Sequence, residues 1–90
     1  MNDTALKAWL ENEGFPSTDS LQQTLHGRIA NATTPLMYAA RMGRIGYIGE
    51  LLSRGADPTL ETLDGFTALE LAANRACMKL LRAASLLQAA

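Results

Sequence analysis

The stretch that decides the fold is residues 34–66, TPLMYAARMGRIGYIGELLSRGADPTLETLDGF, which TALELAANRACMKLLRAAS follows directly at residues 67–85. Placed one above the other, the two stretches align Thr34 with Thr67, and the paired alanines of the first stretch fall on those of the second. The offset is 33 residues, the difference between positions 67 and 34. A self-similarity of this period predicts that the chain is built from units that stack on one another.

The first unit is predicted to form two helices and a loop. Thr34 can cap the first helix, and Pro35 suits the first helical position because its missing N–H has no partner to lose there. Gly43 suits the turn after that helix. The second helix is expected to end at Gly55, before a loop that turns sharply at both ends. One such unit cannot bury its own apolar face, so it has to stack on a neighbour.

The period of 33, the TPLxxAA opening, the second helix, and then GADP and DGFT resemble the ankyrin repeat, a helix pair followed by a projecting loop. The resemblance covers the stretch from Thr34 to Thr67 without insertion or deletion. It implies an all-α fold, a short ankyrin-repeat solenoid of about two to three repeats including divergent caps. The residues of family type are Thr34, Pro35, Leu36, Ala39, Ala40, Gly43, Leu51, Leu52, Gly55, Ala56, Asp57 and Gly65.

We expect residues 1–90 to form a single ankyrin-repeat domain with three parts. Residues 1–33 are the divergent N-terminal cap, residues 34–66 the full repeat, and residues 67–90 a truncated C-terminal capping repeat. Both units depart from the family pattern after the first leucine, because Met37 and Glu70 stand where the family usually has histidine.

Two further helices are predicted in the N-terminal cap. The first has Asp3 or Thr4 as its expected N-cap and ends at Gly14, so it resembles the outer helix of a partial repeat. The second is a short helix within residues 17–27.

The composition argues against several classes of protein. The net charge is −1, and the 8 basic and 9 acidic residues are interspersed, unlike the basic stripe of a nucleic-acid binder. No apolar run approaches the roughly 20 residues of a membrane span. Cys77 is the one cysteine, and the start MNDTALKAW lacks the features of a signal peptide. We therefore expect a cytoplasmic protein with neither a nucleic-acid nor a membrane partner.

The residues that could carry chemistry do not form a recognisable site. His26 precedes Gly27 at a predicted helix end, where a capping role is expected. One cysteine and one histidine cannot supply the four ligands of a zinc site. Asp57 and Asp64 lack the alternating ligands and central glycine of a calcium loop, so we expect them to form turns. The sequence thus predicts no catalysis, no metal and no cofactor.

The glycine cluster GRIGYIG, Gly43 to Gly49, supports an alternative: a small-ligand or nucleotide binder, or an enzyme that uses these glycines. Its spacing is GxxGxxG, and Glu50 follows where a phosphate loop has lysine. We expect Gly46 and Gly49 to lie on the solvent-facing side of the second helix, as a weak helix or as a strip for close packing. The expected apolar side carries Ile45, Ile48 and Leu52.

The resemblance also implies a function, a non-catalytic protein–protein interaction module that serves as an adaptor, inhibitor or regulatory subunit. Its partner-binding surface would combine loop tips with the inner helices. Leu63 and Phe66 are apolar on a polar loop and have no evident core to enter, although Phe66 could instead fold under the next helix. Weak self-association through the C-terminal or outer helix is compatible with this function. The candidate partner-binding residues are Asn31, Thr33, Arg41, Met42, Glu61, Leu63, Asp64, Phe66 and Arg75.

Overall fold

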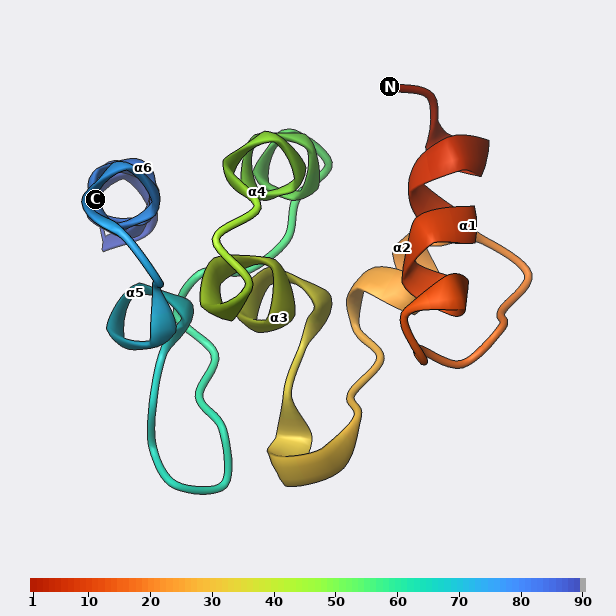
Figure 1. Ribbon diagram of the computed structural model, residues 1–90, viewed down its shortest axis with the longest axis horizontal. Coiled ribbons are helices and arrows are strands. Elements are labelled where there is room, and N and C mark those ends of the chain that lie inside the picture. The colour runs from red at the N-terminus through yellow and green to blue at the C-terminus, as the bar shows by residue number, and fades with distance from the viewer. Residues whose placement is uncertain (90) are drawn as a thin grey trace.

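The computed structural model describes residues 1–89, and in this part the chain is all-α, as predicted. Inner helices α3 and α5 form one row, outer helices α4 and α6 form a second row, and two loops project on the side away from the outer row (Figure 1). Ala90, the last residue of the predicted cap, lies outside the described residues. No helix of residues 1–89 is long and apolar enough to cross a membrane. The helices are α1 (Asp3–Asn12), α2 (Leu21–Leu25), the 3-10 turn η1 (Ala30–Ala32), α3 (Pro35–Arg41), α4 (Ile45–Ser53), α5 (Ala68–Leu71) and α6 (Arg75–Ala89).

The two inner helices begin with the same capping box, at positions 33 residues apart. The hydroxyl of Thr34 accepts a hydrogen bond from the N–H of Met37 at 3.3 Å, and that of Thr67 accepts one from the N–H of Glu70 at 3.4 Å. In return, the Met37 sulfur and the Glu70 carboxylate accept from the N–H groups of the two threonines. The predicted cap at Thr34 is confirmed, and the residues that replace the family histidine complete both boxes.

The turns between inner and outer helices correspond, at residues 42–44 and 72–74, and the second unit is shorter because its inner helix α5 has 4 residues where α3 has 7. Gly43 ends the first helix with φ +71°, the left-handed conformation that its predicted turn position favours. The Asn74 side chain caps α6 by accepting a hydrogen bond from the N–H of Cys77 at 2.9 Å. The N–H of Ala73 donates to the carbonyl of Ala40 at 3.0 Å, so the two turns are bonded to each other.

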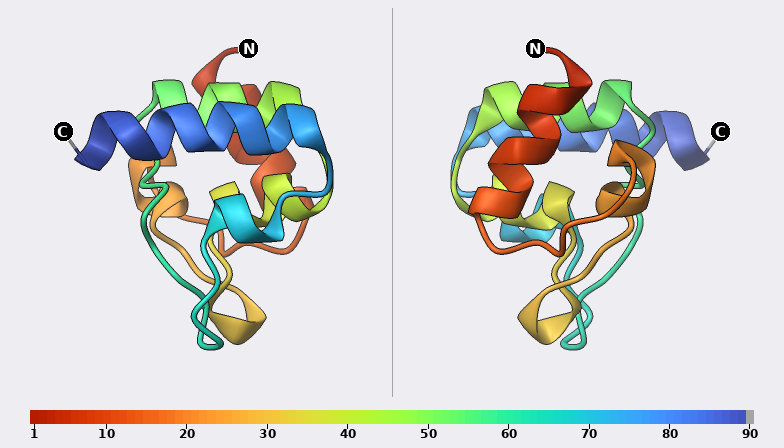
Figure 2. Two further views of the ribbon diagram at one scale, coloured as in Figure 1. Left: turned by 90° about the vertical axis from the view of Figure 1, so that its left-hand side faces the viewer. Right: turned by 90° about the vertical axis from the view of Figure 1, so that its right-hand side faces the viewer.

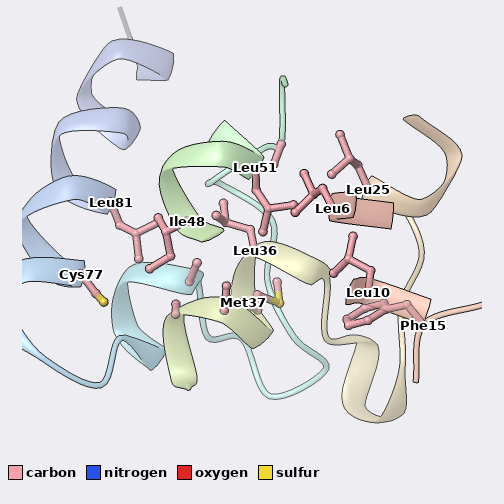
Figure 3. Packing of buried hydrophobic residues seen from close by; sticks show 14 of the residues in the cluster. Leu6, Leu10, Phe15, Leu25, Leu36, Met37, Ile48, Leu51, Cys77 and Leu81 are labelled. Atoms are coloured by element: carbon pink, nitrogen blue, oxygen red, sulfur yellow. The ribbon is translucent and has the colours of Figure 1, made fainter. Parts of the chain in front are cut away.

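A single hydrophobic core runs through all the helix pairs. Figure 3 shows it extending from Cys77 and Leu81 at the C-terminal end to Leu10 and Phe15 in the N-terminal cap. The Cys77 side chain is fully buried, as expected for a structural free thiol. Leu36 is buried within the same core, so residues 34–66 join the segments before and after them into one packed body.

Helix α1 differs from the sequence-based expectation in its cap and in its direction. Its N-cap is Asn2, whose side chain accepts a hydrogen bond from the N–H of Ala5 at 2.7 Å. Asp3 does not cap the helix because its carboxylate pairs with Arg54, with an N–O distance of 2.6 Å. Figure 1 shows α1 along its length while α3 to α6 are seen nearly end-on, so α1 crosses the first helix pair and does not continue the outer row. The predicted end at Gly14 is confirmed by its φ of +109°.

Aromatic packing explains why α1 crosses both helices of the full repeat. Trp9 stacks face to face on Tyr47 of α4, with ring centroids 3.7 Å apart and planes 6° from parallel. The same indole lies 6.1 Å from the ring of Tyr38 on α3. The Tyr38 hydroxyl donates to the Glu13 carboxylate at 2.7 Å, a hydrogen bond that raises the pKa of Tyr38. One face of α1 therefore contacts the inner helix α3 and the outer helix α4 at the same time.

Helix α2 lies within the predicted segment 17–27 and packs against α1 and α3. The ring nitrogen Nδ1 of His26 is 2.8 Å from the carbonyl oxygen of Gln22, so the imidazole meets the end of α2, as expected. The Gln22 side chain donates to the Arg54 carbonyl at 3.0 Å and links α2 to the end of α4.

The two helical glycines of α4 face open space, whereas the predicted position of one isoleucine is wrong. Gly46 is exposed and Gly49 half-buried, and a methyl group placed on either Cα would have no heavy atom outside its own helix within 4 Å. Ile45 is 44% exposed, because it begins α4 and lines a shallow depression with Met1 and Tyr47. The expected close-packing strip has no neighbour among the described residues, so a weak helix is the simpler explanation.

Replacing both Gly46 and Gly49 with alanine should raise the free energy of unfolding by about 1 kcal/mol at each site, because alanine favours the helix and has space there. Urea unfolding followed by circular dichroism measures the change. Gly43→Ala is the matched control and should destabilise, since its φ is +71° and its Cβ would lie 3.2 Å from the Asn74 side chain. A double variant less stable than the wild type would show that the bare strip serves a packing role.

Candidate functional site

The loops at residues 28–33 and 61–66 project together from one side of the helices (Figure 2). Each loop tip closes on itself in the same way. The N–H of Ile29 donates to the Thr33 carbonyl at 2.9 Å, and the N–H of Thr62 donates to the Phe66 carbonyl at 2.9 Å. The donors are 33 residues apart (62 − 29), and so are the acceptors (66 − 33). The earlier loop is therefore the structural equivalent of the later one.

Hydrogen bonds between the two loops join them into one platform. The N–H of Leu63 donates to the Asn31 carbonyl at 3.1 Å, and the Asn31 amide donates to the Asp64 carboxylate at 3.0 Å. The Arg28 guanidinium donates to the Glu61 carbonyl at 2.9 Å. Because the backbone at Leu63 is held before any partner arrives, binding there costs less conformational entropy than binding to a mobile loop.

Two apolar side chains remain exposed on this platform. Leu63 is 79% exposed, although its backbone is fixed by the bond to Asn31. Phe66 is 45% exposed, so its ring is partly covered and partly available to a partner. The exposed acidic residues Glu61 and Asp64 flank these side chains. An apolar centre with polar neighbours is the arrangement typical of protein-binding surfaces.

Thr33 is the one candidate residue that the structure removes from the surface. It is 2% exposed, and its hydroxyl donates to the carbonyl of Ala30 at 2.9 Å. The reason is that the chain turns inward here to enter α3, whose cap is the next residue, Thr34. Thr33 therefore stabilises the loop from inside.

Two residues that the sequence analysis did not select have clear roles in the platform. Arg28 bridges the loops, since the same nitrogen donates to the carbonyls of Ala32 and Glu61, each at 2.9 Å. Ala32 has φ +58°, at the position 33 residues before Gly65, which has φ +85°. Extending the alignment upstream, NATT above DGFT, would have found it. An alanine in this conformation costs about 1 kcal/mol, so the loop geometry is maintained against local strain.

The remaining candidates, Arg41, Met42 and Arg75, form a second group away from the loops. All three are exposed, and Met42 is 50% exposed. They lie at the turns between inner and outer helices, at the far end of α3 from the loop at residues 28–33. The length of α3, 7 residues or roughly 10 Å, separates the groups. The loop tips and the helix turns are therefore two distinct parts of the surface.

Two of the loop carboxylates, those of Asp57 and Asp64, accept hydrogen bonds within the loops. Asp57 accepts hydrogen bonds from the hydroxyl and the N–H of Thr59 at 2.6 and 2.8 Å, and these bonds lower the pKa of Asp57. Asp64 accepts from Asn31. Both groups shape the loops, in agreement with the turn-forming role expected from the sequence.

The glycine cluster does not form a phosphate-binding loop. Gly46 and Gly49 lie inside α4, and Gly43 forms the preceding turn. The depression beside them contains Glu50, whose carboxylate pairs with Arg54 and lies 3.8 Å from the N-terminal ammonium group. Because Gly46 and Gly49 belong to a regular helix and do not form a loop that could wrap around a phosphate, the geometry does not favour the nucleotide alternative.

The comparisons with known proteins agree with this geometry. The family described as "Ankyrin repeat" matches residues 31–63. Two proteins of Arabidopsis thaliana are similar to the chain over 39 residues each, which is 43% of this chain. The "DExH-box ATP-dependent RNA helicase DExH2" is 56% identical, with 2% of its length covered, and the "DExH-box ATP-dependent RNA helicase DExH6" is 59% identical, with 3% covered. The similarity thus extends over little more than one repeat unit and a very small part of either relative.

Proposed function

We propose that this chain, whose residues 31–63 match the ankyrin-repeat family of general protein-interaction modules, is a non-catalytic module that binds a protein partner through its loop tips. In this proposal it acts in the cytoplasm as an adaptor, an inhibitor or a regulatory subunit. Residues 1–33 and 67–90 serve as caps, and the full repeat at residues 34–66 presents the binding surface.

The observation that carries the proposal is the exposure of Leu63 on a backbone that is already held in place. A side chain that is 79% exposed contributes little to folding, yet five residues of two loops take part in the hydrogen bonds that fix its surroundings. Pre-organised apolar side chains of this kind are suited to fill a pocket on a partner. Phe66 extends the same contact.

The chemistry of the platform indicates the kind of partner. Leu63 and Phe66 would fit an apolar pocket on the partner. The neighbouring Glu61 and Asp64 would accept hydrogen bonds from donors or cationic groups around the rim of that pocket. The turn-end group of Arg41, Met42 and Arg75 would contact the partner only if the partner also extends along the inner helices.

We do not propose helicase activity for this chain, although the Arabidopsis proteins are named as helicases. The shared segment covers 2% and 3% of those proteins and is the size of one repeat, so the likeness supports the repeat itself. The glycine-cluster alternative has no comparable support, because its glycines lie within or next to a regular helix.

We expect the double variant Leu63→Ala, Phe66→Ala to lose captured partners, with binding weakened by about tenfold or more, because exposed apolar anchors contribute most of the energy of such contacts. The measurement is affinity capture from lysate of the source cell, with bound proteins identified by mass spectrometry and their affinities then determined with purified protein.

The matched control is Ile45→Ala. Ile45 is 44% exposed, close to the 45% of Phe66, but it lies on the outer helix α4. This variant should retain the same proteins as the wild type. If the double variant also retained them with unchanged affinity, the loop tips would not be the binding surface.

A further inference from the structure

The outward face of α6 carries three basic side chains and no acidic one, whereas basic and acidic residues are interspersed in the sequence as a whole. Arg75, Lys79 and Arg82 are exposed and spaced by four and three residues, so they form one stripe along the helix. The opposite side of α6, with Cys77 and Leu81, is fully buried in the core. Residues 75–89 contain three basic residues and no acidic residue, although the whole chain has a net charge of −1.

No ion pair within the described part of the chain uses these three cations. The ion pairs found within residues 1–89 use Lys7, Arg54 and the N-terminal ammonium, and none uses Arg75, Lys79 or Arg82. Arg75 lies in the first turn of α6, where the helix dipole disfavours a positive charge. The stripe therefore does not stabilise the helix that carries it.

Exposed apolar side chains lie on the same helix. Met78 is 38% exposed, Leu86 is 68% exposed and Leu87 is 79% exposed. Leu86 follows Arg82 by four residues and so extends the basic stripe with an apolar contact. In Figure 1, α6 lies at the end of the outer row with α4 on one side of it, and no helix of residues 1–89 lies on its other side.

We propose that the outward face of α6 binds an acidic amphipathic helix of a partner protein, as a second surface separate from the loop tips. A helix whose apolar side chains are flanked by glutamate or aspartate would cover Leu86 and Leu87 and would pair with the basic stripe. Charge complementarity of this type gives specificity and faster association.

Charge also argues against two other occupants. In a symmetric contact between two copies of α6, the stripes would face each other and like charges would repel. A nucleic-acid backbone would satisfy the cations but would leave Leu86 and Leu87 without an apolar partner. An acidic amphipathic helix satisfies both kinds of side chain.

The probe is a synthetic helical peptide, similar in length to the 15 residues of α6, with leucines along one face and glutamates beside them. Its basic twin carries lysine in place of every glutamate. Fluorescence anisotropy with the full chain should show binding of the acidic peptide that weakens as salt is raised. The triple variant Arg75→Glu, Lys79→Glu, Arg82→Glu should bind it about tenfold more weakly and should bind the basic twin instead.

Two further variants separate this surface from the loops and from loss of fold. Leu86→Ser with Leu87→Ser should weaken binding of the peptide, while Leu63→Ala with Phe66→Ala should leave it unchanged. The circular dichroism spectrum and urea midpoint of each variant should match the wild type, because the changed side chains are exposed.

Three results would overturn the proposal. The triple variant could bind the acidic peptide as the wild type does. The wild type could form a dimer in sedimentation experiments that the triple variant does not form, which would assign the face to a second copy. A single-stranded oligonucleotide could bind more tightly than the peptide and displace it, which would assign the face to nucleic acid.

Discussion

Leu51→Ala should lower the free energy of unfolding by about 3 kcal/mol. Leu51 is fully buried on α4 and belongs to the same core as Leu6 and Leu36 (Figure 3). Its removal leaves a cavity where the full repeat meets the N-terminal cap. Single domains are stable by only about 5–15 kcal/mol, so the loss is a large share of the total.

Urea unfolding followed by far-ultraviolet circular dichroism measures this loss. The matched control is Leu63→Ala, the same change at a side chain that is 79% exposed, and it should alter stability by less than about 0.5 kcal/mol. Equal urea midpoints for the two variants would contradict the core that the structure places around Leu51.

Trp9→Ala should lower the free energy of unfolding by about 2–3 kcal/mol, because it removes the side chain that attaches α1 to both helices of the full repeat. The indole stacks on Tyr47 at 3.7 Å and approaches Tyr38 at 6.1 Å. Without it, the buried side chains of Leu6 and Leu10 still attach α1 to the core, so the loss of stability is partial and α1 is not released.

The same unfolding experiment tests this prediction, with Trp9→Phe as the conservative variant. Phenylalanine keeps an aromatic ring against Tyr47, so most of the stability should return. Because Trp9 is the one tryptophan, its fluorescence in the wild type also reports whether α1 unfolds together with the rest. If Trp9→Ala were as stable as the wild type, the stack would not be what holds α1.

The repeat was predictable from the sequence because its signals act over short distances. The hydroxyl of Thr34 accepts a hydrogen bond from an N–H only three residues further along the chain. Gly43 adopts a positive φ in the turn, where a residue with a side chain would be strained. The same period of 33 separates Asn31 from Asp64, whose side chains the structure joins by a hydrogen bond. Their hydrogen bonds follow from that register.

The candidate surface was predicted only in part. Leu63 is 79% exposed, as expected for an apolar residue on a polar loop with no evident core to enter, whereas Phe66 is 45% exposed and so is partly covered. Thr33 is polar like the exposed candidate Asn31, but it is buried, and its hydroxyl donates to the Ala30 carbonyl inside the turn. Sequence spacing does not reveal whether a hydroxyl meets water or a backbone oxygen.

By itself, the sequence determined the helical repeat, the N-cap at Thr34 and the turn at Gly43, since these depend on residues close together or separated by one period. Only the tertiary structure decided the direction of α1 and the gathering of basic charge on α6. The direction of α1 depends on rings from three segments, Trp9, Tyr38 and Tyr47, packing at once. The basic stripe depends on which face of α6 the core takes, and burial of Cys77 and Leu81 leaves the cations outside.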